Sequence, residues 1–405
     1  MVGMRVLALG GGGEMGAAAA EILAADDSVT GVVIADRNLS RATAVADSLG
    51  AKVSARQTDA TDQAGLVALM RRHDLVVTTV GPFFRYGEPI LRAAIDAGRD
   101  YVDICDDPEP TLRMLELDGR AKAAGICALI GTGASPGVSN MLAVRAAREL
   151  DTVETLVTGW NIAAAQPETS RAGPGPGAAV VHMMEQISGT IPVLREGRLV
   201  NRPALEKLSW HHPGLGVLTG RTVGHPEAVT LHRAFPTLRS STNVCVGDKT
   251  ALRPLAGLRR LIDAGALNPE RAAGLLERAE KLLPSGTSGI FRRGTPPPLF
   301  AVATGLREGR PGVAATILAN TPGFTMAAAT GVPLAVAALL VPAARRPGVH
   351  TQETLIDADD FFAALAPHCL GNPPAGRMTA TTTSWASEQE NKRAFETSPL
   401  TALMN

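Results

Sequence analysis

A glycine-rich run near the N-terminus carries the strongest chemical signal in this sequence. The apolar segment Val6–Leu9 leads directly into Gly10–Gly13, and Gly16 opens an alanine-rich stretch. The spacing Gly-x-Gly-x-x-Gly supplies one glycine for a tight turn, one for close approach of backbone to phosphates and one for helix–strand packing. Backbone amides at the start of the following helix would face the anion. We therefore expect a dinucleotide diphosphate here. The expected contacts to it are Gly11, Gly13, Glu14, Met15 and Gly16.

An acidic residue closes the next apolar segment. Val32–Ala35 ends at Asp36, whose carboxylate would accept hydrogen bonds from the hydroxyls of an adenosine ribose and would repel a 2′-phosphate. The neighbouring Arg37 could stack on adenine or tolerate that phosphate. This pair favours NAD as the cofactor and leaves NADP as the alternative.

A second candidate segment follows the fourth predicted strand. Ligands of a parallel α/β sheet lie beyond the carboxyl ends of its strands. Val80, Gly81 and Pro82 would therefore run along the dinucleotide, and Arg85 or Tyr86 would face a substrate. A simple loop with a buried phenylalanine pair explains the same residues equally well.

Three carboxylates, Asp103, Asp106 and Asp107, lie at the end of the fifth predicted strand. Asp103 is the candidate for a general base or for binding a substrate ammonium group, because burial would raise its pKa. For Asp107 we favour a helix-capping role, because it precedes Pro108 and a predicted helix. Cys105 has no evident activating partner and is interpreted as a packing residue.

The segment from residue 132 to residue 140 is the third candidate. Gly133, Ser135 and Pro136 could contact the nicotinamide amide through backbone amides and a hydroxyl. Ser139 or Asn140 could instead cap a helix over Met141–Leu150, and the two interpretations carry equal weight.

Further along, His182 and Glu185 share one face of a predicted helix. Their i, i+3 spacing resembles that of metal ligands, but no further ligand cluster accompanies it, so we expect no metal site. His182 is a candidate for proton transfer, and a surface or satisfied core histidine fits it at least as well. The other candidates for substrate binding in this region are Trp160, Arg171 and Glu185.

The first third of the chain alternates strand and helix patterns, which predicts an α/β fold with a doubly wound parallel sheet. The predicted strands are Val6–Leu9, Val32–Ala35, Lys52–Ala55, Leu75–Val80, Tyr101–Cys105 and Cys127–Ile130. The predicted helices are Gly16–Ala25, Ser40–Leu49, Gln63–His73, Glu88–Ala97 and Thr111–Ala124. Beyond residue 137 the pattern favours an α+β domain with an antiparallel sheet. It includes hairpins around Glu196-Gly197 and Glu308-Gly309.

Composition narrows the class of protein. The chain has 405 residues and a formal net charge of zero, which gives no indication of a nucleic-acid surface or a basic membrane-binding patch. Its four cysteines are scattered, as is typical of a reduced cytoplasmic protein. The N-terminus leads into a predicted core strand, so we expect no signal peptide. The apolar stretch 324–341 is nearly uncharged and about long enough to span a membrane, but its alanine content, Gly331 and Pro333 favour a buried helix.

The ordered motifs together resemble the saccharopine dehydrogenase-like superfamily. The segments concerned are LGGGGEMG, VVIADRN, TTVGPFFRYGEPIL, YVDICDD and GTGASPGVSNMLA, with TMAAATGVPLAVAALL and PGVHTQETLIDADDFF near the C-terminus. They are most similar to the branch that contains lysine 6-dehydrogenases and carboxynorspermidine synthases. The resemblance implies a Rossmann domain built from residues 1–135 and 324–405, with an inserted α+β domain over residues 136–323 that serves substrate binding and dimerisation.

The resemblance also implies a nicotinamide-dependent oxidoreductase acting on a C–N bond of an amino-acid or amine substrate. Arg85 and Arg171 would then bind the substrate carboxylate and Asp103 its amine, while Asp103, His182 or Tyr86 would exchange the proton. We expect a cytoplasmic homodimer. Two alternatives stay open: a non-redox lyase or transferase that uses bound NAD transiently, and a catalytically silent NAD-binding protein.

Overall fold

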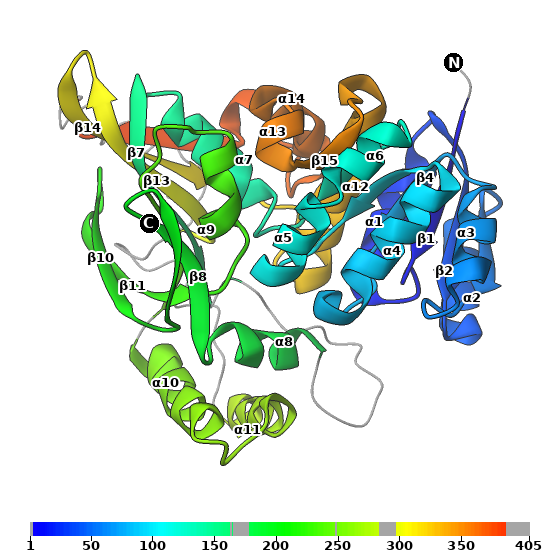
Figure 1. Ribbon diagram of the computed structural model, residues 1–405, viewed down its shortest axis with the longest axis horizontal. Helices are drawn as coiled ribbons and strands as arrows, with labels where there is room; N and C mark the ends of the chain where they lie inside the picture. The colour runs from blue at the N-terminus through cyan, green and yellow to red at the C-terminus, as the bar shows by residue number, and fades with distance from the viewer. Residues whose placement is uncertain (1–2, 163, 165–177, 248, 283–296, 386–405) are drawn as a thin grey trace. The chain divides into compact units, whose positions relative to one another are not determined.

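The computed structural model describes residues 3–162, 164, 178–247, 249–282 and 297–385 (Figure 1). The chain divides into two compact units. The first unit comprises Met1–Met141 and Thr321–Ala375, and the second comprises Leu142–Asn320 and Gly376–Asn405.

The first unit is built on a parallel sheet whose order, among the described strands, is β15-β6-β5-β4-β1-β2-β3. Its strands are β1 (Met4–Leu9), β2 (Val29–Asp36), β3 (Val53–Gln57), β4 (Leu75–Thr78), β5 (Asp100–Asp103), β6 (Cys127–Ile130) and β15 (Gly348–Thr351). The chain moves outward from β1 to β3 and then returns to β4 on the other side of β1. The predicted doubly wound parallel sheet is therefore confirmed, and its topological switch point lies between β1 and β4.

Helices cover both faces of this sheet. They are α1 (Glu14–Ala25), α2 (Leu39–Leu49), α3 (Gln63–Met70), α4 (Phe83–Ala97), α5 (Pro108–Leu115), α6 (Asp118–Ala123), α12 (Met326–Ala344), α13 (Gln352–Leu355) and α14 (Ala358–Leu365). Helix α7 (Val138–Ala147) crosses from the first unit into the second. The single helix predicted over Thr111–Ala124 is wrong: the Leu117 amide bonds to the Met114 carbonyl, three residues back, and the chain turns there between α5 and α6.

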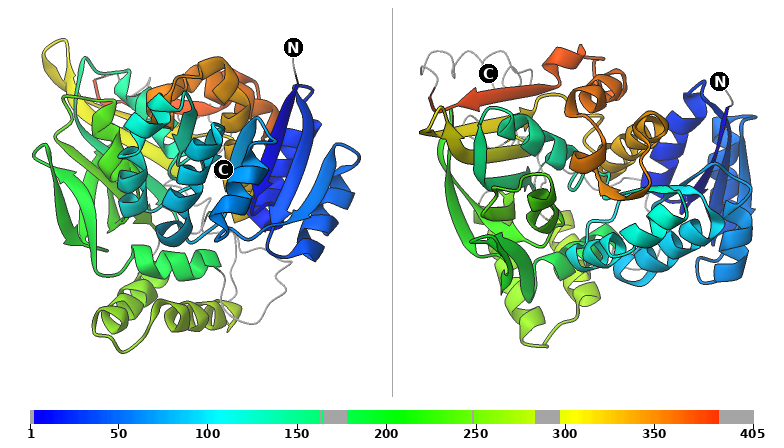
Figure 2. Two further views of the ribbon diagram at one scale, coloured as in Figure 1. Left: turned by 45° about the vertical axis from the view of Figure 1, so that its right-hand side comes forward. Right: turned by 45° about the horizontal axis from the view of Figure 1, so that its top comes forward.

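Helix α12 is, among the described helices, the one long and apolar enough to cross a membrane. Within the first unit it packs against α1 (Figure 2). The contact depends on Gly331, where a Cβ atom would overlap the Met15 carbonyl oxygen and lie 2.9 Å from the Ala18 methyl carbon. A crossing this close identifies α12 as a core helix of this unit, as the sequence predicts.

The second unit holds a mixed sheet with the order β10-β11-β12-β7-β13-β14-β16, while β8 pairs with β12 and with β9. The strands are β7 (Thr152–Asn161), β8 (Thr190–Arg195), β9 (Arg198–Pro203), β10 (Lys207–His212), β11 (Gly216–Val223), β12 (Ser240–Val246), β13 (Leu299–Arg307), β14 (Arg310–Leu318) and β16 (Thr379–Thr383). The helices are α8 (Ala178–Gln186), α9 (Glu227–Thr230), α10 (Lys249–Asp263) and α11 (Pro269–Leu282). Its buried core includes Phe300, which stacks on Trp210.

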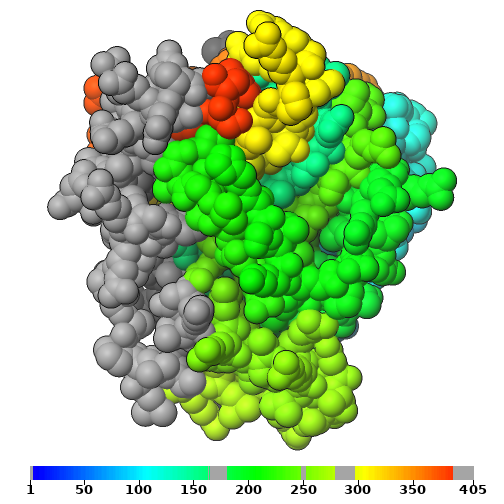
Figure 3. All heavy atoms as spheres, turned by 90° about the vertical axis from the view of Figure 1, so that its left-hand side faces the viewer, coloured from blue at the N-terminus to red at the C-terminus, as the bar shows by residue number. Residues whose placement is uncertain are grey.

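The predicted antiparallel sheet is confirmed for the other described strand pairs of this unit, but β12 runs parallel to β7, which makes the sheet mixed. A parallel neighbour requires a crossover connection, and the chain between β7 and β12 supplies one by passing through β8, β9, β10 and β11. Strands β10 and β11 lie on the face of the molecule drawn in Figure 3.

Both predicted hairpins are confirmed. Glu196 and Gly197 join β8 to β9 with φ angles of 52° and 76°, and Glu308 and Gly309 join β13 to β14 with φ angles of 51° and 72°. Two consecutive positive φ angles are typical of the type I′ turns that fit the twist of antiparallel strands.

The assignment of all residues 324–405 to the first unit is wrong for the chain after Ala375. The threonine-rich run at residues 379–383 forms β16 and pairs with β14. Thr381 exchanges a hydrogen bond of 2.8 Å with Thr316, and Ala380 packs against the core of the second unit. Threonine is polar, but its β-branched side chain favours an extended strand.

Candidate functional site

The turn after β1 has the geometry of a phosphate-binding loop. Gly10 has a φ angle of +76°, a conformation that favours glycine, and its amide bonds to the Ala35 carbonyl of β2 at 2.8 Å. The Gly13 amide bonds to the Gly10 carbonyl at 3.0 Å, and Gly13 then caps α1. The amide end of a 12-residue helix thus follows directly on the tight turn.

Close packing explains the last glycine of the motif. A Cβ atom at Gly16 would lie 2.6 Å from the Gly10 carbonyl oxygen and 2.7 Å from the Gly11 Cα atom, both of which are backbone. A Cβ atom at Gly13 would meet only the Gly10 oxygen, at 3.3 Å. Gly16 therefore sets the approach of α1 to the turn, whereas a Cβ atom at Gly13 would require its neighbour to shift by only a few tenths of an ångström.

Asp36 lies at the carboxyl end of β2, beside the glycine turn. Its Oδ1 atom accepts a hydrogen bond of 2.9 Å from the Asn38 amide, and its Oδ2 atom lies 2.9 Å from the position of a Cβ atom at Gly12. Only a glycine leaves this space free. Arg37 is exposed, and its carbonyl accepts a hydrogen bond from Gln57. A carboxylate fixed next to an open backbone cradle fits the adenosine ribose of a dinucleotide.

Thr79 was missed by the sequence analysis. Its hydroxyl donates to the Gly10 carbonyl at 3.1 Å, so that the end of β4 is tied to the glycine turn of β1. The available signal was a hydroxyl residue at the end of a strand that neighbours β1. The loop that follows contains Val80, Gly81 and Pro82, with Gly81 and Pro82 exposed.

Helix α4 begins at Phe83, earlier than predicted, because the buried Phe83 ring docks its first turn on the unit. Arg85 and Tyr86 therefore lie in a helical turn, with the Arg85 guanidinium 5.1 Å from the centre of the Tyr86 ring. Phe84 is 53% exposed, so the alternative interpretation of this segment as a loop with a buried phenylalanine pair is wrong.

Asp103, at the end of β5, is fully buried and accepts three hydrogen bonds. The Gly131 and Cys105 amides donate to Oδ1 at 2.8 Å and 2.9 Å, and the Tyr101 hydroxyl donates to Oδ2 at 2.9 Å. Burial raises the pKa of Asp103 to about 6, although the two amides oppose that rise. These contacts join the loops after β5 and β6 and support a positioning role; a catalytic role for Asp103 stays a prediction.

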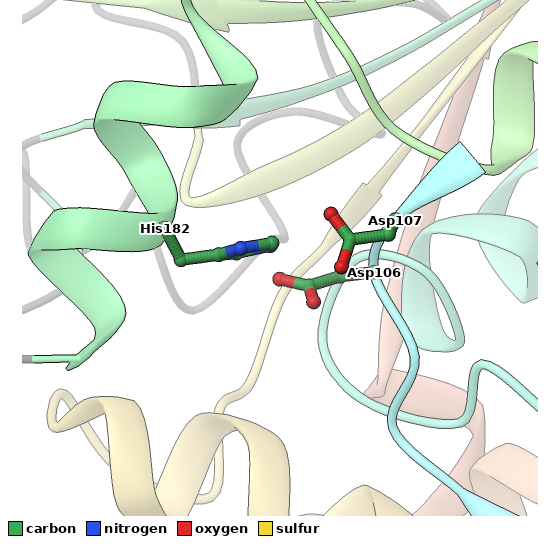
Figure 4. Close-up of side chains that lie close together, drawn as sticks. All are labelled: Asp106, Asp107 and His182. Carbon is green, nitrogen blue, oxygen red and sulfur yellow. The ribbon is translucent and has the colours of Figure 1, made fainter. Parts of the chain in front are cut away.

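Cys105 is buried, and burial raises the pKa of its thiol well above the usual value, which agrees with a packing residue. Asp106 and Asp107 extend from the same loop after β5 (Figure 4). Asp107 occupies the N-cap position of α5, but its side chain makes no capping hydrogen bond, so the predicted capping role is wrong. A capping side chain accepts from the amide of the second or third helical residue, and the third residue of α5 is Pro110, which has no N–H group.

The loop after β6 is tightly folded. Gly133 and Gly137 form a bridge, and a Cβ atom at Gly137 would overlap the Gly133 carbonyl oxygen. Asn140 accepts a hydrogen bond from the Gly137 amide at 3.0 Å and donates to Glu353 at 2.8 Å. The helix begins at Val138 rather than Met141. Ser135 and Pro136 lie in this loop; their contact with a nicotinamide stays a prediction.

In the second unit, His182 and Glu185 lie on α8, with His182 Nδ1 3.5 Å from Glu185 Oε2 (Figure 4 shows His182). The Trp160 ring packs against His225, with ring centres 5.9 Å apart. Arg171 lies outside the described residues.

Comparison with known proteins identifies the first unit. Residues 6–129 match the family model of the saccharopine dehydrogenase NADP binding domain. A relative from Mycobacterium tuberculosis is 35% identical over 106 residues, which are 25% of this chain and 25% of the relative. A relative from Mycobacterium ulcerans is 34% identical over 102 residues, 24% of each chain. Both carry the name trans-acting enoyl reductase, provisionally in the first case. The matches thus span about a quarter of these relatives.

A solved structure extends the likeness in fold. The apo saccharopine dehydrogenase (L-Glu forming) from Saccharomyces cerevisiae superposes with a TM-score of 0.62 and 17% identity, covering 94% of this chain and 100% of that chain. The glycine turn, Asp36 and the family match together assign NAD(P) to the first unit. Residues 6–129 thus match a saccharopine dehydrogenase NADP binding domain, in agreement with the resemblance seen in the sequence.

Proposed function

We propose that this protein is an NAD(P)-dependent oxidoreductase that acts on a C–N bond of an amino-acid or amine substrate. The observation that carries the oxidoreductase proposal is the cradle formed by Gly10, Gly16 and Asp36 within a saccharopine dehydrogenase-type NADP-binding domain. The motifs that resemble those of lysine 6-dehydrogenases and carboxynorspermidine synthases support a C–N bond as the site of the reaction.

The proposed reaction balances as a hydride and a proton transfer. In the oxidative direction the substrate C–H bond breaks, a proton leaves the nitrogen, and a C=N bond forms. The bound dinucleotide supplies the hydride acceptor or donor. The protein's own contribution is to orient the two reactants and to hold the proton.

Among the proposed site residues, His182 and Tyr86 remain the candidates for proton exchange, since the carboxylate of Asp103 already accepts three internal hydrogen bonds. Arg85, at the start of α4, is the candidate for a substrate carboxylate. Trp160 and Glu185 are the candidates for substrate binding in the second unit. We propose further that the protein is a cytoplasmic homodimer.

For the cofactor we propose NAD rather than NADP. The Asp36 carboxylate would lie next to the 2′-phosphate of NADP, and these two negative charges would repel each other. The exposed Arg37 beside it is the residue that would moderate this preference.

The names of the mycobacterial relatives support a second candidate, the reduction of an enoyl C=C bond. There the hydride would go to one carbon and a proton to its neighbour. These matches cover about a quarter of the chain, which is shorter than the segment that matches the dinucleotide-binding domain.

A turnover panel distinguishes the candidates. Nicotinamide absorbance is followed with lysine, other diamines and amine-plus-2-oxoacid mixtures, and separately with enoyl thioesters. Turnover of an amine or imine supports the proposal, and reduction of thioesters alone replaces it with the second candidate. Silence in protein that binds NAD(P) would favour transient use of the cofactor or a catalytically silent protein.

A further inference from the structure

Thr79, directly after β4, is bonded to the neighbouring strand β1 and to the glycine turn that follows it (Figure 1 shows both strands). Its backbone amide donates to the Leu9 carbonyl at 2.9 Å, which extends the pairing of β4 with β1 by one residue beyond Thr78. Its hydroxyl donates to the carbonyl of Gly10, the next residue of β1's chain, at 3.1 Å. The Leu9 carbonyl oxygen lies farther from the hydroxyl, at 3.4 Å.

The Thr79 hydroxyl lies in space that two glycines leave open. A Cβ atom at Gly10 would lie 2.9 Å from the hydroxyl oxygen, and a Cβ atom at Gly16 would lie 2.8 Å from it. Gly10 belongs to the turn after β1, and Gly16 belongs to the first turn of α1. One side chain therefore lies where the end of β4, the glycine turn and α1 meet.

The Gly10 carbonyl connects these elements. It accepts the Thr79 hydroxyl and also the Gly13 amide, at 3.0 Å, and a carbonyl oxygen has two lone pairs for two such donors. The Gly13 bond closes the turn, and Gly13 is the N-cap residue of α1. A hydrogen bond that fixes the Gly10 carbonyl therefore also fixes the turn that leads into the amide end of α1, where an anion binds favourably.

The turn has little stiffness of its own. Residues 10–13 are four consecutive glycines, and glycine loses more conformational freedom on ordering than any other residue. A loop that is already held in its bound conformation costs less to order when the ligand arrives, and this raises the affinity. A hydrogen bond from outside the turn is therefore expected to favour binding.

We propose that Thr79 is a positioning residue for the dinucleotide: its hydroxyl holds the Gly10 carbonyl, and with it the glycine turn, in the conformation that receives the diphosphate. Thr79 acts through Gly10 and not through a contact of its own with the ligand. The inference depends on the NAD(P) cofactor and not on the substrate, so it is independent of whether the enzyme acts on a C–N or a C=C bond.

Calorimetric titration of the full chain with NAD⁺ tests the proposal. Thr79→Val and Thr79→Ala remove the hydroxyl, and each should weaken binding by about three- to tenfold, the range expected for one net hydrogen bond. Thr79→Ser keeps the hydroxyl and should bind within about twofold of the wild type. Thr30→Val is the matched control, because the Thr30 hydroxyl donates to the Met4 carbonyl at the opposite end of β1 and its loss should leave the affinity unchanged.

Two further measurements separate positioning from a general loss of structure. The loss in Thr79→Val should be as large for ADP as for NAD⁺, since both carry the diphosphate, and absent for adenosine, which lacks it. Hydrogen exchange of the Gly13 amide, followed by NMR without ligand, should be faster in Thr79→Val and unchanged in Thr79→Ser, because the acceptor of that amide is the Gly10 carbonyl.

Wild-type affinity for NAD⁺ in Thr79→Val and Thr79→Ala would overturn the proposal, as would an equal loss in Thr79→Ser. An unchanged exchange rate of the Gly13 amide in Thr79→Val would also overturn it. So would an equal loss of affinity for adenosine, because damage would then extend beyond the glycine turn. The panel of nicotinamide absorbance measurements tests the oxidoreductase function separately.

Discussion

Replacement of Asp103 by asparagine gives the sharpest test of the role of this residue. Asparagine keeps the shape of the side chain and can still accept both backbone hydrogen bonds, from Gly131 and Cys105. Its amide group can donate to the Tyr101 oxygen, so that contact can be reversed without being lost. The change therefore removes a buried charge and preserves the contacts that join the two loops.

The expected change in the free energy of unfolding follows from the pKa of the Asp103 carboxyl group. Burial raises the pKa from 3.8 to about 6, and each pKa unit is worth about 1.4 kcal/mol, so the ionised form in the fully buried site costs about 3 kcal/mol. Between these two values the folded state binds more protons than the unfolded state, and stability falls as the pH rises. The contribution of Asp103 is thus fully present below pH 3.8 and lost above about pH 6.

Urea unfolding of the wild type and of Asp103→Asn over this pH range provides the assay. Both tyrosines, Tyr86 and Tyr101, lie in the first unit, so tyrosine absorbance reports on that unit separately. The free energy of unfolding of the wild type should fall by about 3 kcal/mol relative to the variant between about pH 4 and pH 7. Asp103→Ala, by contrast, leaves two buried amides without their acceptor and should be less stable than Asp103→Asn by about 2 to 4 kcal/mol at all pH values.

The reasoning would be refuted if the free energies of unfolding of the wild type and of Asp103→Asn changed with pH in parallel. It would also be refuted if the wild type gained stability relative to the variant as the pH rises. Retained NAD(P) turnover in Asp103→Asn would favour the positioning role. Turnover lost in a fully folded Asp103→Asn that binds cofactor normally would instead support the predicted catalytic role.

Three further predictions follow from contacts in the two units. Gly16→Ala should weaken NAD(P) binding by more than about tenfold in a titration, because its Cβ atom meets backbone, whereas Gly119→Ala, at an open position in α6, should bind within a few-fold of the wild type; equal losses would contradict the packing argument. Gly331→Ala should lower the free energy of unfolding by about 1 to 3 kcal/mol through overpacking against α1, while Gly274→Ala, at an open helical position, should raise it by about 1 kcal/mol. The four cysteines are all buried, so a thiol reagent should label none of them in the native protein and all of them in denaturant; rapid native labelling would show that a thiol is accessible.

Local patterns in the sequence were sufficient to predict the parts of the fold that local chemistry determines. The Glu-Gly pairs at 196–197 and 308–309 identified two hairpins, because glycine adopts a positive φ angle readily and each pair lies between two strand-forming segments. The glycine spacing and Asp36 identified the dinucleotide-binding turn, because the turn, the helix and the ribose contact all arise within one short stretch of sequence.

Contacts between distant segments could not be predicted in this way. Nothing local to Asp103 shows that the amide of Gly131 reaches its carboxylate, since that contact depends on the pairing of β5 with β6. The same applies to Thr79, whose partner Gly10 lies in the turn after β1. His182 and Gln186 are visibly one helical turn apart, but His225 joins them only through the tertiary fold.

Titration calorimetry with NAD⁺ and NADP⁺, on the wild type and on Asp36→Ala, tests the central claim most directly, because it requires no knowledge of the substrate. The account predicts that the wild type binds NAD⁺ at least about tenfold more tightly than NADP⁺, a difference of about 1.4 kcal/mol, and that Asp36→Ala narrows or reverses this preference. Tighter binding of NADP⁺ by the wild type, or no binding of either dinucleotide, would contradict it.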